Sequence, residues 1–384
     1  MIKEEDKKNI PFNISLIVTE QCNLNCVYCF EHSKSARKMT FQVAKDALDA
    51  LLRLDHAYGW VNIEFTGGEP LLNFGLIQLV FLYVKSAYKE HTKKITFSIG
   101  TNGTVLNAGM LAWFKRFPCI SIGLSLDGTK QVHDHNRSGS YDSVMKNVDF
   151  FRKYDVPVKM TISPYTIEHL AESVTHIHEL GFAVEANVVF ENIWGGCRKK
   201  SRLLKTYARE LEKLVEYYDK HRDKKVPFLI EGGLESLLVP WEEDHKFCGS
   251  GQSMITVGPD GKKYPCHRFA SIACGRSAEN VNFAFSEVKP YKCVGCKIRR
   301  MCHSCLGYNF EKYGDIDHRT VYHCEFVKLQ LRAAALYRMK TIKRVLAHDM
   351  ALTPAELKAK ADAVLFVEKH VEPVEKICSL THNT

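Results

Sequence analysis

The chain reads Ile14-Ser-Leu-Ile-Val18 and, a few residues later, Cys22-Asn-Leu-Asn-Cys26-Val-Tyr-Cys29. The apolar run predicts a buried strand, and three cysteines with the spacing C-x3-C-x2-C follow it. Three thiolates this close can bind three irons of a four-iron cluster and leave the fourth iron without a protein ligand. Catalytic metal sites keep such an open position. A zinc site is the alternative, and His32 is the one nearby candidate for its fourth ligand.

Composition places the chain among ordinary globular proteins. It has 384 residues, of which 45% are hydrophobic and 25% charged, enough for one large domain and a smaller one. The first eight residues are mostly charged, and no secretory signal or membrane-spanning stretch follows them. We therefore expect a cytoplasmic protein with no membrane partner.

The cysteine content and the net charge indicate which ligands the protein binds. Fourteen cysteines without a signal peptide indicate metal ligation and not a disulfide framework. The net charge of +9 would fall if cysteine-ligated clusters, which are net anions, were bound. The lysines are scattered along helical segments, which is typical of solvated faces and not of nucleic-acid binding. A basic groove for an acidic peptide segment stays open.

Strands and helices alternate along the first half of the chain. Six such units predict parallel βα repeats, and right-handed crossovers make a partial (β/α)6 barrel their natural closure. Asn73 and Asn107 lie where the caps of two of the helices are expected. The strands are expected at 14–19, 61–65, 95–99, 120–126, 157–162 and 184–190, and the helices at 40–56, 73–90, 105–117, 140–154, 167–180 and 200–221.

Polar or glycine-rich clusters follow four consecutive predicted strands. After the cysteine triplet come Thr66-Gly-Gly-Glu-Pro70, Thr101-Asn-Gly-Thr104 and Ser125-Leu-Asp-Gly128. A single Gly-Gly or Asn-Gly usually marks only a turn. Because barrel active sites are built at the carboxyl ends of strands, four clusters there predict one site.

A second group of cysteines begins at residue 248, after a plausible linker at 240–245. Seven thiols support two more metal centres with one ligand missing, and two zinc ribbons are the alternative reading. The seven are Cys248, Cys266, Cys293, Cys296, Cys302, Cys305 and Cys324.

The first cysteine motif resembles that of the radical S-adenosylmethionine (SAM) enzymes. In that family the open iron chelates SAM, and one electron yields a 5′-deoxyadenosyl radical that abstracts a hydrogen atom. The resemblance implies that Tyr28 lies against the adenine and that Gly67, Gly68, Glu69 and Pro70 form the site for the SAM amino group. It implies that Ser125 and Asp127, with Asn102 as a further candidate, lie near the SAM carboxylate and ribose. Arg137 matches a recurrent arginine that binds a carboxylate or forms a salt bridge at the rim.

The second group resembles the SPASM domain, which carries two auxiliary four-iron clusters, except that its final pair is spaced x2 where x3 is usual. The family's interleaved ligation implies one distal cluster, and a proximal cluster with only three protein ligands. The distal set is Cys293, Cys296, Cys302 and Cys324, and the proximal set is Cys248, Cys266 and Cys305. We expect an N-terminal tail over 1–12, a radical SAM barrel over 13–235, a SPASM domain over 236–335 and a helical segment over 336–384.

Two classes of SPASM enzyme are alternative interpretations of this sequence. Anaerobic sulfatase-maturing enzymes, which make formylglycine, have an additional cysteine after the first SPASM position and an aspartate after Tyr-Pro-Cys. Here 249–255 contains no cysteine, and the second motif reads Tyr264-Pro-Cys-His267. The sequence is therefore more similar to thioether-forming maturases of ribosomally made peptides, whose open proximal iron binds the peptide cysteine. His267 is the alternative ligand there, or a base.

This reading implies several partners. They are a cysteine-containing precursor peptide, an external one-electron donor of the flavodoxin or ferredoxin type, and a separate leader-peptide-binding protein, because only 21 residues precede Cys22. Carbon–carbon crosslinking is a further enzymatic alternative, and a zinc-ribbon binding module is the non-enzymatic one. Among the other cysteines, we expect Cys119 in the core as a small hydrophobe. Cys274 is a candidate spare ligand, and Cys197 and Cys378 have no assigned role.

Overall fold

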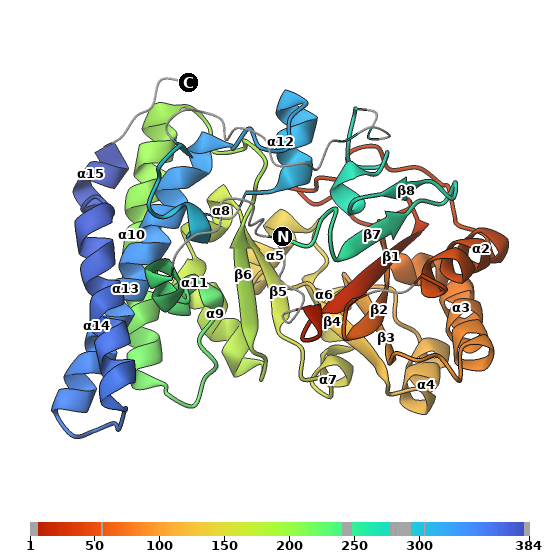
Figure 1. Cartoon of the computed structure of the whole chain (residues 1–384), viewed down its shortest axis with the longest axis horizontal. Coiled ribbons are helices and arrows are strands. Elements are labelled where there is room, and N and C mark those ends of the chain that lie inside the picture. The colour runs from red at the N-terminus through yellow and green to blue at the C-terminus, as the bar shows by residue number, and fades with distance from the viewer. Residues whose placement is uncertain are drawn as a thin grey trace.

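The computed structural model describes residues 7–54, 57–239, 248–276, 278, 281, 293–302 and 304–379. The linker expected at 240–245 lies outside these ranges. Within them the chain forms a mixed α/β structure in which parallel strands occupy the centre and helices the periphery (Figure 1).

Six parallel strands form the predicted partial barrel. They are β1 (Pro11–Thr19), β2 (Trp60–Gly67), β3 (Ile95–Thr101), β4 (Ile120–Leu124), β5 (Val158–Ile162) and β6 (Val184–Val188). Strands β1 to β4 pair in order within one sheet, and β5 pairs with β6. A single parallel bridge between Ser125 and Lys159 joins the two sheets. The α/β class and the parallel strand order are thus as predicted.

Helices cover the outer face of this barrel, and α10 (Cys197–Lys220) follows β6. Between the strands lie α2 (Phe41–Leu52), η1 (Pro70–Asn73), α3 (Phe74–Ala87), α4 (Ala108–Arg116), α5 (Lys130–Asn136), α6 (Tyr141–Met145), α7 (Val148–Phe151), α8 (Pro164–Ile167) and α9 (Leu170–Glu179). The helix predicted at 140–154 is broken at Asn147, whose backbone angles are not helical. The short helix α5 was not predicted.

The two expected helix caps behave differently. Asn107 accepts a hydrogen bond from the Met110 N–H, as a cap should. Asn73 precedes α3 but makes no side-chain cap. Its amide donates instead to the carbonyls of Val18 (2.8 Å) and Met39 (3.3 Å). Asn73 therefore ties the start of α3 to the end of β1.

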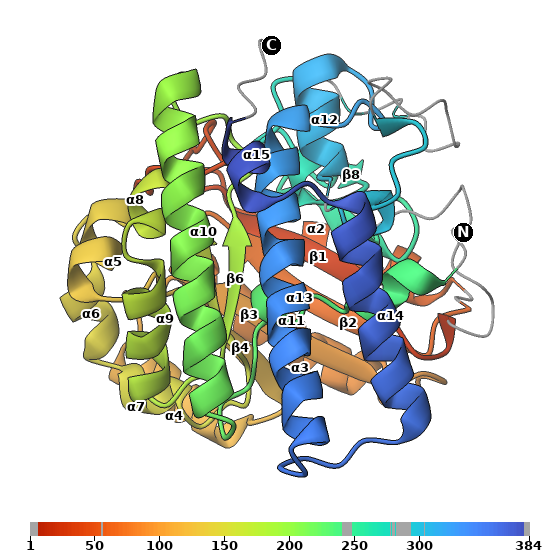
Figure 2. The same ribbon diagram turned by 90° about the vertical axis from the view of Figure 1, so that its left-hand side faces the viewer.

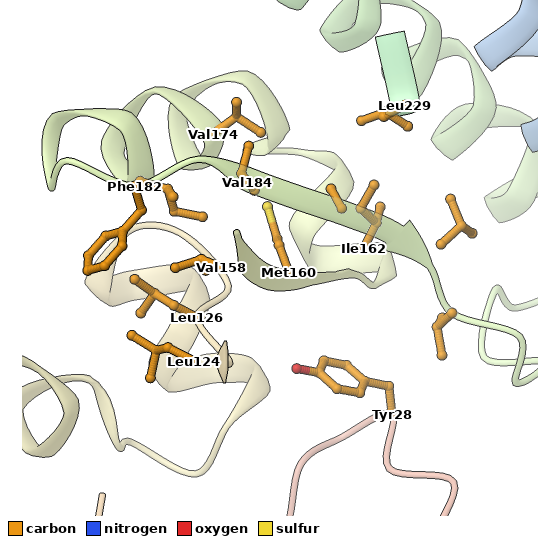
Figure 3. Packing of buried hydrophobic residues seen from close by; sticks show 14 of the residues in the cluster. Tyr28, Leu124, Leu126, Val158, Met160, Ile162, Val174, Phe182, Val184 and Leu229 are labelled. Atoms are coloured by element: carbon orange, nitrogen blue, oxygen red, sulfur yellow. The ribbon is translucent and has the colours of Figure 1, made fainter. Parts of the chain in front are cut away.

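The strands alternate apolar residues on their outer face with polar residues on their inner face. Outward-facing side chains such as Ile14, Ile63 and Met160 are at most 2% exposed. Figure 3 shows Met160 and Val184 of β5 and β6 in the same apolar cluster as Val174 of α9. In a complete TIM barrel the interior is also filled with branched apolar residues, whereas here the hydrophobic core lies between the strands and the helices.

The inner face is polar on every strand. Its residues include Ser15, Glu64, Ser98, Ser121, Lys159 and Asn187, and all but Ser15 line a cavity. Hydrogen bonds connect neighbouring strands across this face: Ser15 donates to Glu64 (2.5 Å), and Asn62 donates to Ser98 (3.0 Å). The strands therefore present hydrogen-bonding side chains to the open space inside the barrel.

The cysteine-rich part of the chain joins the barrel directly. Strand β7 (Met254–Val257) pairs in parallel with β1, and the short strand β8 (Lys263–Tyr264) pairs antiparallel with β7. The elements after them are η3 (His267–Phe269), η5 (Arg299–Met301), α12 (Leu306–Tyr313) and η6 (Val321–His323). The barrel sheet thus continues into the segment that we expected to begin a second domain.

A layer of long helices closes the molecule on the side of β6 (Figure 2). It consists of α10, α13 (Cys324–Leu346), α14 (Pro354–His370) and α15 (Val374–Ser379), with α11 (Phe228–Glu231) and η2 (Leu234–Leu238) beneath α13. The predicted helical C-terminal segment is confirmed, although α13 begins earlier, at Cys324. Arg338 of α13 is 4% exposed and bonds the carboxylate of Glu235 in η2 through Nε (2.8 Å) and Nη2 (3.2 Å).

Among the described residues, one stretch, Pro70–Ala87, is long and apolar enough to cross a membrane. It comprises η1 and α3 on the barrel's outer face, where Leu76, Ile77, Val80, Phe81 and Val84 are buried. Packing against the sheet explains its apolar composition.

Candidate active site

The open space inside the barrel is one cavity of about 750 Å³. It extends from the cysteine triplet, across the carboxyl ends of the strands, to the segment around residue 267. Among the residues predicted to contact a cofactor, those that line it are Cys22, Cys26, Tyr28, Cys29, Gly67, Gly68, Glu69, Asn102, Ser125 and Arg137. The structure therefore brings the four strand-end clusters together around a single cavity.

The loop with the three cysteines is held by the segment that follows α5. The Val27 N–H donates to the Asn136 carbonyl (3.0 Å), and the Asn25 N–H donates to the Ser138 hydroxyl (3.0 Å). Ser138 has a φ of 56°, a conformation that is uncommon outside glycine. Within the loop, the Leu24 N–H points at the Cys22 sulfur (3.4 Å). Each of these contacts fixes the spacing of the thiols.

Gly67 and Gly68 allow the second strand end to approach the first. A Cβ on Gly67 would lie 2.1 Å from the Thr19 carbonyl oxygen, and one on Gly68 would lie 2.4 Å from that of Gln21. Gly67 also has a φ of 131°. No side chain fits at either position without moving the backbone. The glycines are thus required by the close contact between the Gly-Gly turn and the cysteine loop.

Glu69 joins the second strand end to the third. Its carboxylate accepts hydrogen bonds from the Thr101 hydroxyl (2.8 Å) and from the N–H groups of Asn102 (2.8 Å) and Leu71 (3.1 Å). Burial raises the pKa of Glu69 to about 7, although these hydrogen bonds oppose the change. The Asn102 amide in turn donates to Asn23 in the cysteine loop (3.0 Å).

Tyr28, Asp127 and Arg137 form a buried polar cluster behind the thiols. Asp127 is fully buried and accepts hydrogen bonds from the Tyr28 hydroxyl and the Thr161 N–H (3.0 Å). Its carboxylate also pairs with Arg137 Nε at 3.1 Å. Tyr28 and Arg137 line the cavity, but Asp127 does not. Asp127 therefore orients two side chains of the site from the layer beneath.

The three thiols of the triplet suit a metal group. Burial raises the pKa of Cys26 to about 11, and the neighbouring thiols add to the rise. Such thiols ionise when a bound metal supplies the compensating charge. Among the described residues, no three His, Cys, Asp or Glu side chains converge as they would around a single ion. Each thiolate of a four-iron cluster binds a different iron, so the thiols need not converge. His32, the candidate fourth zinc ligand, pairs with Glu311 (3.0 Å).

The later cysteines form two further groups. Burial raises the pKa of Cys266 to about 12, and the Cys305 and Cys248 thiols contribute to the rise. Burial likewise raises the pKa of Cys302 to about 11, where the contributing thiols are Cys293 and Cys296. Cys266 thus has Cys305 and Cys248 as thiol neighbours, and Cys302 has Cys293 and Cys296.

A second, small cavity brings Cys324 close to cysteines of both groups. It is lined by Cys293, Cys302, Cys305 and Cys324. Cys305 lines the large cavity as well, so it forms part of the wall between the two spaces. Cys305 precedes the first residue of α12, and Cys324 is the first residue of α13. Thiolates and anionic clusters are favoured at helix N-termini.

His267 and Arg268 lie at the end of the large cavity that Cys305 occupies. The His267 ring is 5.4 Å from that of Phe30, and its buried Nδ1 has no hydrogen-bond partner within the described part of the chain. Burial lowers the pKa of His267. The Arg268 guanidinium pairs with Glu191 (2.6 Å) and lies over the Phe30 ring at 4.5 Å. Arg268 thus bridges the cysteine loop and the second cysteine group.

One prediction about the other cysteines was wrong. Cys119 is exposed, because it lies in the turn before β4 and Ile120 is the first residue of that strand to enter the core. Cys274 is buried next to the Cys266 segment but does not line the large cavity. Cys197 is exposed at the start of α10, and Cys378 is buried in α15.

Several cavity residues were missed by the sequence reasoning, among them Lys34, Glu64, Lys159 and Arg268. For Glu64 and Lys159 a signal was present: polar residues alternate with apolar ones along β2 and β5. Strict alternation indicates a strand with only one apolar face. No local motif marks Lys34.

A known protein family matches the part of the chain that carries the cysteine triplet and the other strand-end clusters. Residues 16–189 match the family described as the Radical SAM superfamily. This part of the chain is therefore similar to a radical SAM domain. The domain implies SAM and one four-iron cluster, which the three thiols lining the cavity fit.

Two relatives extend the comparison along the chain. An uncharacterized protein of Methanocaldococcus jannaschii is 34% identical over 176 residues, which is 44% of this chain and 59% of that protein. A cysteine-type anaerobic sulfatase-maturating enzyme of Clostridium perfringens is 26% identical over 342 residues, or 80% of this chain and 91% of that enzyme. The chain thus spans less than two thirds of the first relative and most of the second.

A solved structure shares the fold beyond the barrel. Native anSMEcpe with bound AdoMet and the Cp18Cys peptide superposes with a TM-score of 0.65 and 22% identity, covering 88% of this chain and all of that one. The similarity in fold therefore extends beyond the barrel into the cysteine-rich segment and the helices that follow it.

Proposed function

We propose that this chain is a cytoplasmic radical SAM/SPASM peptide maturase that joins a peptide carbon to a peptide cysteine through a thioether. The supporting observation is that the cysteine triplet, His267 and Cys305 all line one cavity. A peptide segment in this cavity would meet residues of both cysteine groups.

The chain's own residues have distinct proposed roles. The triplet would hold the SAM-binding cluster, which together with SAM supplies the radical that removes a hydrogen atom from the peptide. The backbone of Gly67 to Glu69 would face the SAM amino group, and Pro70 would rigidify that turn. Asn102, Ser125 and Arg137 would face its carboxylate and ribose. Asp127 would act by holding Tyr28 and Arg137, since it does not reach the cavity.

The second cysteine group would hold two auxiliary clusters. We assign Cys248, Cys266 and Cys305 to the proximal cluster, and Cys293, Cys296, Cys302 and Cys324 to the distal one. His267 would contact the substrate thiol or occupy the remaining ligand position. The proposed partners are a cysteine-containing precursor peptide, a flavodoxin- or ferredoxin-type electron donor and a separate leader-peptide-binding protein.

Formylglycine formation is the second candidate. The match to a sulfatase-maturating enzyme over most of both chains supports it. Two features of this chain favour the thioether reading: 249–255 lacks a cysteine, and His267 stands where that enzyme class has an aspartate. Product mass distinguishes the two reactions. A thioether removes two hydrogens and leaves no thiol to alkylate, whereas formylglycine loses the sulfur and gains an aldehyde.

The first experiment measures iron, sulfide and zinc per chain after anaerobic reconstitution. We expect about twelve irons in the parent and about eight in a Cys22/Cys26/Cys29→Ala variant. Cys119→Ala, which removes an exposed cysteine, is the matched control and should retain about twelve. About four irons with zinc in the remaining sites would refute the auxiliary clusters and the thioether proposal with them.

A further inference from the structure

Lys34 lies beside the cysteine triplet without belonging to any motif. Its ammonium donates to the carbonyl of Leu24, inside the loop between Cys22 and Cys26, at 3.3 Å. The side chain therefore reaches back over the loop, and it lines the cavity together with all three thiols. A lysine in this position is fixed in space relative to the sulfurs.

The sulfurs and the ammonium interact electrostatically. The charges of all three cysteine sulfurs act on the Lys34 ammonium. In the described part of the chain, no carboxylate lies within ion-pair distance of Lys34. Glu31, the nearest acidic group along the chain, interacts with it at longer range. The positive charge is thus directed at the thiols and is not neutralised locally.

Two other charged groups next to the triplet are already engaged. Arg137 acts on Cys26 but is paired with Asp127. Glu69 acts on Cys22 but accepts three hydrogen bonds from its own surroundings. Lys34 is the cavity-lining cation that contacts the cysteine loop itself and has no ion-pair partner among the described residues.

We propose that Lys34 is a positioning residue whose charge makes the triplet's iron–sulfur cluster easier to reduce. A cation near a redox centre stabilises the state with the additional electron, because the reduced cluster is the more negative one. The inference rests on the proposed function, in that the triplet holds a four-iron cluster. A higher reduction potential would increase the driving force for electron transfer from the external donor to the triplet's cluster.

The test is a redox titration of the reconstituted full-length protein, followed by electron paramagnetic resonance. The signal that is absent from the Cys22/Cys26/Cys29→Ala variant identifies the relevant cluster. Lys34→Gln should lower the ratio of reduced to oxidised cluster about tenfold at a fixed potential, which corresponds to about 59 mV for one electron. Lys34→Arg keeps the charge and should titrate like the parent.

Lys38→Gln is the matched control. Lys38 is an exposed lysine four residues further on, and its ammonium also donates to a carbonyl, that of Leu72 at 3.4 Å. It does not line the cavity, so its removal should leave the titration unchanged.

Three results would overturn the inference. The first is a Lys34→Gln variant whose cluster titrates at the same potential as in the parent. The second is a Lys38→Gln variant whose cluster potential shifts as much as that of Lys34→Gln. The third is an unshifted titration accompanied by at least tenfold weaker SAM binding, which would make Lys34 a contact to the SAM carboxylate. If instead the triple alanine variant loses no iron, the triplet holds no cluster, and the proposed function and this inference both fail.

Discussion

Replacing Asp127 by Asn should destabilise the protein more than any other single exchange of a carboxylate for an amide near the site. Asp127 is fully buried, accepts hydrogen bonds from Tyr28 and Thr161, and forms an ion pair with Arg137. Asparagine would remove the charge opposite a buried guanidinium and turn an NH₂ group toward one of three donors. Breaking a buried ion pair from one side costs about 3–5 kcal/mol.

The cost should be visible in thermal unfolding of the metal-free protein under reducing conditions. We expect the midpoint to fall by roughly 5–10 °C. The matched control is Asp134→Asn in α5, the helix that follows Asp127. Its carboxylate pairs with Lys130 at 3.1 Å and is 26% exposed, and the hydrogen bond that it accepts from the Tyr141 N–H (2.8 Å) can also be accepted by an asparagine oxygen. Such partly exposed pairs contribute about 0–1 kcal/mol, so this variant should unfold within about 2 °C of the parent.

A double variant gives the decisive comparison. If the loss in Asp127→Asn comes from an unpaired Arg137, then adding Arg137→Leu should cost less than the two single losses combined. The reasoning is refuted if Asp127→Asn unfolds like Asp134→Asn, or if the double variant is fully additive.

Two further predictions concern the turn at the second strand and the helical layer. Gly68→Ala should reduce the iron bound per chain at the triplet, because its methyl group would meet the Gln21 carbonyl at 2.4 Å. The control is Gly75→Ala in α3, where the space around the residue is open. This variant should bind as much iron as the parent and be more stable by about 0.5–1 kcal/mol. Burial acts to raise the pKa of Glu235, but the Arg338 hydrogen bonds outweigh it and lower that pKa to about 2. Glu235→Gln should therefore lose about 2 kcal/mol at pH 7, and the difference from the parent should shrink as pH falls from about 5 toward 2, since the unfolded carboxylate protonates first. A pH-independent difference in melting temperature would contradict the assignment.

The barrel was predictable because its strands follow a simple rule. Each apolar run is bounded by turn residues and followed by a helical pattern, so the order of six parallel units could be read from sequence. The broken helix around Asn147 and the short helix α5 were not predictable in this way, because tertiary contacts decide them. Arg137 ends α5 and its side chain pairs with Asp127, a contact that no local pattern encodes.

The candidate site was predictable where a motif has a chemical reason. Cysteine spacing and the Gly-Gly turn mark the cavity wall, because thiols and close backbone approach need particular residue types. The position of Asp127 behind the wall was not predictable, since Asp-Gly reads equally as a turn or as a contact. Lys34 was invisible for a related reason: its role comes from where its long side chain reaches, and many conformations of the preceding loop would take it elsewhere.

The polar interior of the barrel has a consequence for how this protein tolerates change. Stability comes from the apolar layer between the strands and the surrounding helices, whereas the inward-facing side chains contribute little to that layer. Substitutions at Ser98, Ser121 or Asn187 can therefore alter the shape and charge of the cavity at a small cost in folding free energy. A scaffold divided in this way can change what its cavity binds by mutation of the lining while its fold stays intact.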